Sequence, residues 1–268
     1  MILQFHLNKF RPALTLGIVA ALGLTAGLVG AQAPAPVDKE ETKKKEWNTG
    51  INAGLNYNQG NSETIQINGG ILSEYKKNAN ELRLSLQGAY GESALTKNSA
   101  SNKTAQTTVQ NARGIAEYRR LVNEYNYIYV NGDAKHDQMA GIDYRLVAGP
   151  GFGRYFLKKD IQTLSAEAGL AYVCQRLSGD VNDSINLRLA QRYAINLLTG
   201  SKLWESIELL PAITDPSNYF FNFEIGAEAA MTARLSLRIV LQDQYNNRPA
   251  KNKQQNNLQL IAGVGYKL

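Results

Sequence analysis

The stretch that decides the fold class is residues 47–58, WNTGINAGLNYN. Every even position in it is Asn or Gly, whereas the odd positions carry Trp47, Thr49, Ile51, Ala53, Leu55 and Tyr57. Side chains of a β-strand point alternately to its two faces, so a period of two gives one apolar and one polar face. The stretch therefore predicts a two-faced β-strand rather than a helix.

The same alternation recurs as far as the C-terminus. Apolar rows with polar or small partners occupy residues 65–71, 82–90, 144–152, 164–172, 185–195, 219–229, 235–241 and 258–268. Three further segments, whose pattern is weaker, complete a series of twelve strands: 105–120, 124–134 and 202–211. For the first two segments the sequence does not decide which residues point outward, and in the third Glu205 interrupts the apolar row. Ten or fourteen strands are the alternatives.

The connections between these strands also alternate. Short connections follow every second strand, and mostly longer, polar ones follow the others, at residues 93–104, 135–141, 177–184, 212–217 and 246–257. Short turns at one end and long loops at the other are typical of outer-membrane barrels. Only the first connection on the long-loop side, Gly60-Asn61-Ser62, is tight.

The chemistry of the two faces predicts which one meets lipid. Charged side chains stand in the middle of strands on the polar face, and Tyr or Trp recurs near strand ends on the apolar face, as suits membrane interfaces. We therefore predict an antiparallel transmembrane β-barrel over a soluble one such as a lipocalin. The residues expected to line its lumen include Arg83, Arg145, Glu167, Arg188, Arg192, Glu224, Glu228 and Arg238.

The N-terminus has the layout of a secretory signal peptide. Lys9 and Arg11 precede an apolar run from Ala13 to Val29, and small residues follow. Because a membrane-spanning helix needs about 20 apolar residues, a signal peptide over residues 1–31 is favoured over an uncleaved anchor. Residues 32–46, with two prolines and eight charges of both signs, predict a periplasmic charged linker, and the barrel occupies residues 47–268.

Charge and location limit the partners. Loss of Lys9 and Arg11 lowers the formal charge from +6 to +4, and the remaining basic residues do not cluster on one element. Nucleic-acid binding is therefore not expected. The expected location is the outer membrane of a Gram-negative bacterium, with both termini periplasmic, and the expected partners are outer-membrane lipid and the barrel-assembly machinery.

Several short segments, in this order, resemble the YdiY-like family of salt-induced outer membrane proteins, a family of undefined function. They are residues 60–64 (GNSET), 117–119 (EYR), 143–146 (DYRL), 149–153 (GPGFG) and 166–172 (AEAGLAY). The resemblance covers most of residues 47–268. It implies an outer-membrane barrel and a link to osmotic or salt stress, and it supplies no catalytic residues.

The chain offers little for catalysis, metals or cofactors. His136, the one histidine outside the signal peptide, lies beside Asp137 in an expected external loop, and no serine stands at a marked position near it. Glu224 and Glu228 are about 13 Å apart along a strand and cannot form a dyad by themselves. We expect no catalytic, cofactor or metal site, although an aspartic-type protease needs only paired carboxylates and stays open.

Three smaller features are better explained by structure than by ligand binding. The polar segment Asp180–Asp183 lacks the spacing of a calcium loop, and Cys174 is a lone thiol expected to face lipid. In Gly149-Pro150-Gly151-Phe152-Gly153 the three glycines face one way, which makes room for bulky neighbours or bends the strand.

The leading functional hypothesis is a narrow passive channel for small solutes or ions. The alternative is a closed barrel with a structural, adhesive or stress-protective role, and the third is an outer-membrane lipase or protease. The expected lumen charges nearly cancel. The five arginines named above stand against six carboxylates, since Glu74, Glu81 and Asp143 are also expected in the lumen beside Glu167, Glu224 and Glu228. For the hairpin over 219–245, a three-residue turn at 232–234 predicts that Glu228 lies opposite Arg238 in the lumen.

Overall fold

The structure is a computed structural model, and it describes residues 46–58, 62–95, 105–197 and 200–268. These contain twelve strands: β1 (Trp47–Asn58), β2 (Ser62–Lys77), β3 (Asn80–Leu95), β4 (Ala105–Leu121), β5 (Asn126–Asp137), β6 (Ile142–Lys158), β7 (Gln162–Leu177), β8 (Asp180–Asn196), β9 (Lys202–Pro211), β10 (Tyr219–Ala230), β11 (Leu235–Asn246) and β12 (Asn256–Lys267). The expected signal peptide and all of the linker except Glu46 lie outside the described residues.

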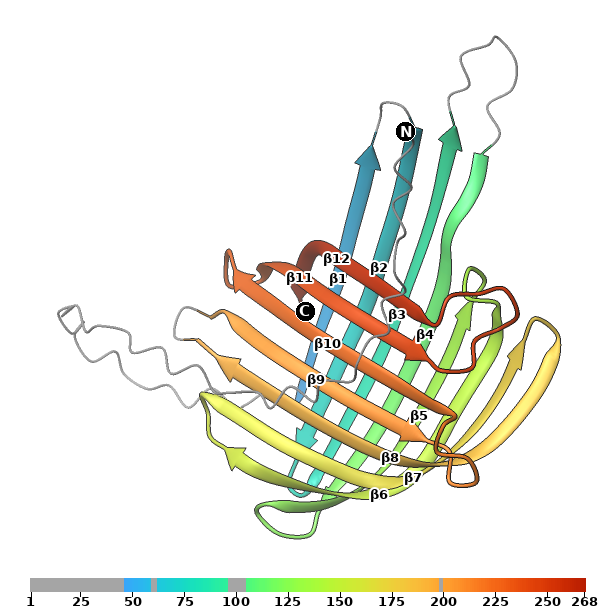
Figure 1. The fold of residues 1–268 in the computed structure, drawn as a ribbon. Helices are drawn as coiled ribbons and strands as arrows, with labels where there is room; N and C mark the ends of the chain where they lie inside the picture. Colours follow the sequence, from blue (N-terminus) through green and yellow to red (C-terminus); the bar gives the residue numbers. More distant parts are fainter. Residues whose placement is uncertain (1–45, 59–61, 96–104, 198–199) are drawn as a thin grey trace, which may run out of the picture. The chain divides into compact units, whose positions relative to one another are not determined.

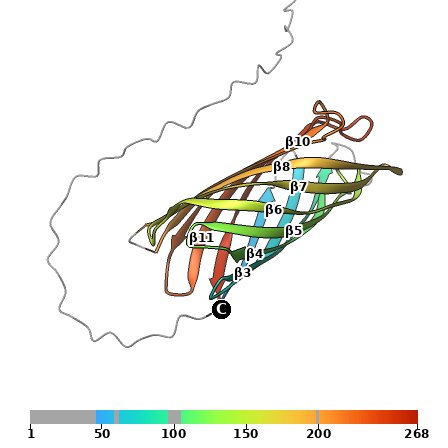
Figure 2. The same cartoon turned by 90° about the horizontal axis from the view of Figure 1, so that it is seen from below.

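The strands close into one antiparallel barrel. Each strand pairs with the next in sequence, and β1 pairs with β12 to complete the ring (Figures 1 and 2). The prediction of twelve strands is therefore confirmed. It includes the three segments with weak patterns, which form β4, β5 and β9.

The barrel carries its apolar side chains on the outside. Leu55, Leu86 and Leu260 are each more than 60% exposed, whereas the charged Glu167 and Arg188 are 5% and 2% exposed. This facing is the reverse of that in a soluble barrel and matches a barrel surrounded by lipid. Within the described ranges no helix is long and apolar enough to cross a bilayer.

Part of the interior is packed solid. The rings of Tyr127 and Tyr155 lie 5.0 Å apart in a buried cluster that also contains Tyr129. Nearer the end with the long loops, Val147, Val173, Ala171, Leu210 and Phe220 form a second, apolar cluster. These side chains project inward from β5, β6, β7, β9 and β10, so this side of the lumen is occupied by protein.

Inward-facing glycines make room for the tyrosines. Tyr129 lies directly opposite Gly151, and Tyr127 lies opposite Gly153. A Cβ atom placed on either glycine would lie 2.3 Å from the facing tyrosine ring. The expectation that these glycines accommodate bulky neighbours is therefore confirmed. Gly149 has a different reason, because a Cβ there would lie 1.9 Å from the backbone oxygen of Leu170.

Two loop predictions are wrong. The polar segment 177–184 is a tight turn at Ser178 and Gly179, whose φ angles of 48° and 98° suit a hairpin turn, and β8 continues to this turn. His136 belongs to strand β5, where it is exposed, and its Nδ1 lies 2.8 Å from the backbone oxygen of Asp143. Polar strand ends that continue beyond the apolar band resemble loops in sequence.

A bulge places Asp143 differently from the expectation. The pairing of β6 with β7 shifts between Ile142 and Tyr144, so the alternation does not continue to Asp143. Its carboxylate lies 3.6 Å from Arg176 Nε, and both side chains are about half exposed. Asp143 therefore belongs to the rim of the barrel and not to the lumen.

The register predicted for the hairpin of β10 and β11 is confirmed. Glu228 pairs with Arg238 and Ala229 pairs with Leu237. The Met231 N–H donates to the Leu235 carbonyl at 2.8 Å, as the three-residue turn requires. Among the described residues, however, no ion pair joins the two side chains. Arg238 instead lies 4.8 Å above the ring of Trp204.

Two of the long connections are tied together at the other end of the barrel. Arg248, after β11, donates to the carboxylate of Asp215, after β9, and the Ser217 hydroxyl donates to Asp215 Oδ1 at 2.6 Å. The Ser217 hydrogen bond, followed by the contact with Arg248, lowers the pKa of Asp215.

We predict that Gly151→Ala destabilises the barrel by about 1–3 kcal/mol, because the new methyl group overpacks against Tyr129. The measurement is urea unfolding of the protein refolded into lipid bilayers. Gly132→Ala is the matched control, since a Cβ there meets no atom within 4 Å. Equal stability of the two variants would show that the tyrosine packing is looser than described.

Candidate functional site: the charged lumen

The candidate site is a set of ion pairs inside the barrel. Inward rows of four strands supply it: β4 contributes Glu117 and Arg119, β7 contributes Glu167, β8 contributes Arg188 and Arg192, and β9 contributes Glu208. These residues lie nearer the end of the barrel with the short turns, where β4 and β8 end and β5, β7 and β9 begin. The period of two sends all six side chains inward.

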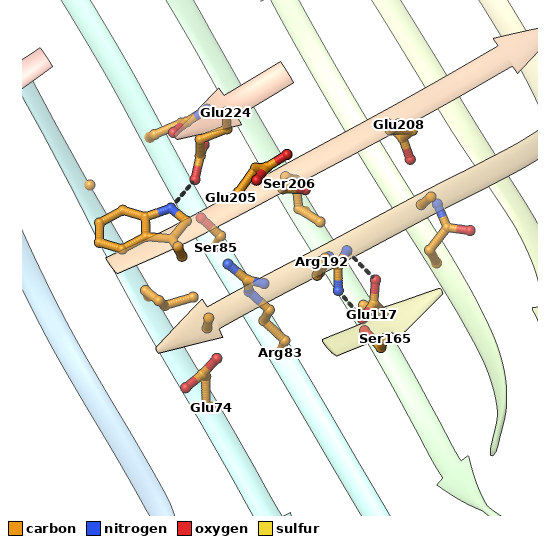
Figure 3. A pocket seen from close by; sticks show the side chains of 18 of the residues that line it. Glu74, Arg83, Ser85, Glu117, Ser165, Arg192, Glu205, Ser206, Glu208 and Glu224 are labelled. Atoms are coloured by element: carbon orange, nitrogen blue, oxygen red, sulfur yellow. Dashed lines mark hydrogen bonds and ion pairs between the residues drawn. The ribbon is translucent and has the colours of Figure 1, made fainter. Parts of the chain in front are cut away.

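One ion pair spans the lumen. Arg192 donates from Nη1 and Nη2 to the two carboxylate oxygens of Glu117, each at 2.8 Å (Figure 3). The two residues stand on β8 and β4, which are not neighbours in the ring. A bidentate contact between a guanidinium and a carboxylate is among the strongest hydrogen-bonded pairs in proteins. This pair therefore fixes the two walls relative to each other.

Glu167 is the centre of the network. Its Oε1 accepts from Arg119 Nη2 at 2.7 Å and from the Tyr127 hydroxyl at 2.9 Å, and its Oε2 accepts from Arg188 Nη1 at 2.8 Å. Arg188 also donates from Nε to Glu208 at 2.6 Å. Arg119 Nε lies 2.6 Å from Glu117, which links the centre to the pair across the lumen.

The network is electrically balanced. It contains the three carboxylates of Glu117, Glu167 and Glu208 and the three guanidinium groups of Arg119, Arg188 and Arg192. Tyr127 and Tyr129 cover it, since Arg119 and Arg188 lie 4.9 and 5.1 Å from their ring centroids. Charges held away from water are tolerable only when they are paired and hydrogen-bonded in this way.

Further charged contacts lie above the network, toward the long loops. Arg113 donates from Nε to both oxygens of Asp133, at 3.1 and 3.0 Å. Lys135 Nζ lies 3.1 Å from Asp137 and donates to Gln244 at 2.6 Å. Arg145 lies 4.3 Å above the ring of Phe220. This level therefore combines ion pairs with the apolar cluster described above.

A cavity of about 550 Å³ lies beside the network. Its charged lining includes Arg83, Arg192, Glu224 and Arg238 and comes from β2–β4 and β8–β11, with Asp133 added by β5. In Figure 3, Arg83 points into this space, and Glu224 accepts a hydrogen bond of 2.7 Å from the Trp204 indole. Interior space with such a lining favours water and polar solutes.

The structure places the eight expected lumen residues in three environments. Arg83, Arg188, Arg192, Glu224, Glu228 and Arg238 line the cavity. Glu167 lies within the ion-pair network, and Arg145 packs against Phe220 on the filled side of the lumen. The eight do not form a single ring of charge.

Sequence reasoning missed several members of the network. Glu117, Arg119 and Arg113 recur at odd positions of β4 and could have been found by their period of two. The alternate row of β4, Ala112, Gly114 and Ala116, is so small that it does not look like a lipid-facing row. Tyr127 and Tyr129 were missed because β5 has large apolar residues on both faces.

The described residues show little that suggests a catalytic centre or a metal site. His136 is exposed on the outer face of β5, away from the lumen network. No group of three or more His, Cys, Asp or Glu side chains within the described ranges is arranged to hold a metal ion. Asp180 and Asp183 differ in parity along β8, so they point to opposite faces.

The chain belongs to the family described as "Protein of unknown function, DUF481", whose model matches residues 51–268. Among proteins with curated descriptions, none matches. Similar solved structures include the KdgM porin (9% identity, 83% of this chain and 99% of that one, TM-score 0.43) and the NanC porin (9%, 82% and 100%, 0.49). A third is the translocator domain of the autotransporter NalP from Neisseria meningitidis (13%, 83% and 87%, 0.40). Similarity at this level assigns no function.

We predict that Arg188→Gln lowers the free energy of unfolding by about 3 kcal/mol, because it removes the cation shared by the buried carboxylate of Glu167 and the partly buried one of Glu208. Arg176→Gln is the matched control. It breaks the half-exposed pair with Asp143, which contributes about 0–1 kcal/mol. Urea unfolding in bilayers measures both. If the two variants lose the same stability, the lumen network is solvated and not a buried one.

Proposed function

We propose that this protein is a narrow passive channel for small solutes or ions in the outer membrane of a Gram-negative bacterium. The observation that carries the proposal is the cavity of about 550 Å³ inside a closed barrel whose outer face is apolar. Its lining contains polar and charged side chains from both walls. A barrel with a polar interior and a lipid-facing exterior is built like the channel-forming barrels of outer membranes.

The location follows from the sequence together with the topology. We propose that the signal peptide is cleaved after Ala31 and that residues 32–46 form a periplasmic linker before the barrel. β1 begins and β12 ends on the side of the short turns, because Gly50 pairs with Lys267. In outer-membrane barrels the short turns are periplasmic, so both termini belong there. Outer-membrane lipid and the barrel-assembly machinery are then the natural partners, and nucleic acid is not among them.

The ion pairs make the proposed channel narrow and weakly selective. The pair of Arg192 and Glu117 crosses the lumen, so a solute has to pass beside it through the remaining cavity. A one-sign ring of charge gives a pore its ion selectivity. Here cations and carboxylates alternate in equal numbers within the network, which argues for little preference between anions and cations.

A closed barrel with a structural, adhesive or stress-protective role is the second candidate. The tyrosine cluster and the apolar cluster around Val173 and Phe220 fill one side of the lumen, which favours closure. A connection with osmotic or salt stress rests on the resemblance to the YdiY-like proteins and suits either candidate. A lipase or protease is third, since the exposed His136 lacks the arrangement that a catalytic triad needs.

Single-channel recording of the purified protein in planar bilayers tests the channel. We expect small conductance steps with little selectivity in the wild type. Arg192→Ala should raise the conductance, because it removes the side chain that bridges the walls. It should also favour cations, because Glu117 loses a partner. Glu117→Gln combined with Arg192→Ala should raise the conductance with less change in selectivity.

Arg176→Gln, which alters only the rim, is the control and should conduct like the wild type. Insertion is checked by the difference in gel mobility between folded and boiled protein. Well-inserted protein that gives no steps, with no gain in either lumen variant, would reject the channel and favour the closed barrel.

A further inference from the structure

Two charged couples face the cavity without forming ion pairs. Glu74 and Arg83 lie directly opposite each other on β2 and β3, and Glu228 and Arg238 do so on β10 and β11. All four side chains line the cavity. Within the described part of the chain, none of the four has a hydrogen bond from its side chain or an ion pair. Each of the six charged side chains of the network, in contrast, forms at least one ion pair.

The freedom of Arg83 has a structural cause. Its other neighbour in the register is Glu117 on β4, and both oxygens of that carboxylate are held by Arg192 across the lumen. The close-up shows Arg83 between the two walls, with Glu74 below it and no hydrogen bond or ion pair drawn from its guanidinium (Figure 3). The guanidinium of Arg83 is therefore available to a molecule in the cavity.

The second couple is supported from behind by Trp204. A Cβ on Gly226 would lie 2.1 Å from the indole, so the ring lies against the inner wall at that glycine. The indole N–H is bound to Glu224, and Arg238 lies 4.8 Å from the ring. Trp204 thus holds the Arg238 guanidinium beside the cavity and close to a natural fluorescent reporter.

A ligand with one sign of charge fits these couples poorly. The Cβ atoms of directly opposed residues lie about 4.5–5.5 Å apart, so an anion at Arg238 or Arg83 meets a carboxylate next to it. Lys202, which is opposite Glu228 on the other side, gives that carboxylate a cation on both flanks. A small molecule that carries both charges can satisfy a cation and a carboxylate at once.

We infer that the cavity binds small zwitterionic solutes, in which a carboxylate and a cationic nitrogen are separated by a short chain. The solute carboxylate contacts the arginine of one couple, Arg83 or Arg238, and its cationic group contacts the carboxylate of the same couple, Glu74 or Glu228. This inference names a solute class for the proposed channel and rests on that function only for the route by which the solute arrives.

Binding is measured in detergent, so the result does not depend on conduction. The full-length protein contains two tryptophans, and Trp47→Phe leaves Trp204 as the only one. We expect a saturable change in Trp204 emission on titration with glycine betaine. Arg238→Gln and Glu228→Gln, which change the couple beside Trp204, should each weaken the apparent affinity about tenfold, because each removes one contact between opposite charges. Arg176→Gln, at the rim, should have no effect.

Choline and acetate, each of which carries one of the two charges, separate the zwitterion from a single-sign ligand. The inference holds if neither alone reproduces the response to glycine betaine at equal concentration. It is overturned if either one does, if folded protein shows no saturable response, or if Arg238→Gln and Glu228→Gln bind like the wild type. Conductance without binding rejects this inference alone, and binding without conductance rejects only the channel.

Discussion

The hydrogen bonding of the backbone is the constraint on which the rest of this structure depends. In lipid no water is present to satisfy an exposed N–H or C=O, so a sheet can cross a membrane only when it closes on itself. The pairing of β1 with β12 completes that closure. Once the ring is closed, the period of two decides everything else: half of the side chains must meet lipid and the other half must share a confined interior.

That interior combines two solutions to the same problem. On one side, tyrosines lie over glycines and apolar residues pack as in a soluble core. Beside the tyrosines, buried charges are compensated in ion pairs, of which Arg192–Glu117 and Arg119–Glu167 join strands that are not neighbours. Arg188 is the most buried of these cations. The residue is 2% exposed, and its guanidinium binds the carboxylates of both Glu167 and Glu208. Four charges that border the cavity, Glu74, Arg83, Glu228 and Arg238, stay outside these pairs.

Nine of the twelve strands could be predicted with their facing, because each of these carries a clear alternation of apolar and polar residues. Prediction failed where that signal is local but ambiguous. The polar ends of β7 and β8 read as a loop, and β5 has tyrosines inside and aliphatic residues outside, so hydrophobicity does not alternate. The network itself was beyond reach for a different reason. Glu117 and Arg192 are 75 residues apart and stand on strands that do not pair. No register argument brings them together, and only the curvature of the closed wall does.

The joint that closes the ring is also its shortest. Gly50–Ala53 of β1 are the residues paired with β12, whereas β8 and β9 are joined by eight residue pairs and the other neighbours by more. At the end of this joint, Gly54 of β1 and Gly263 of β12 allow the two strands to approach closely. A Cβ atom on either glycine would lie within 2.5 Å of a backbone oxygen of the facing strand. A closed sheet separates most easily where the fewest backbone hydrogen bonds join two neighbouring strands. We therefore expect the barrel to open first between β1 and β12, where four residue pairs hold the wall closed.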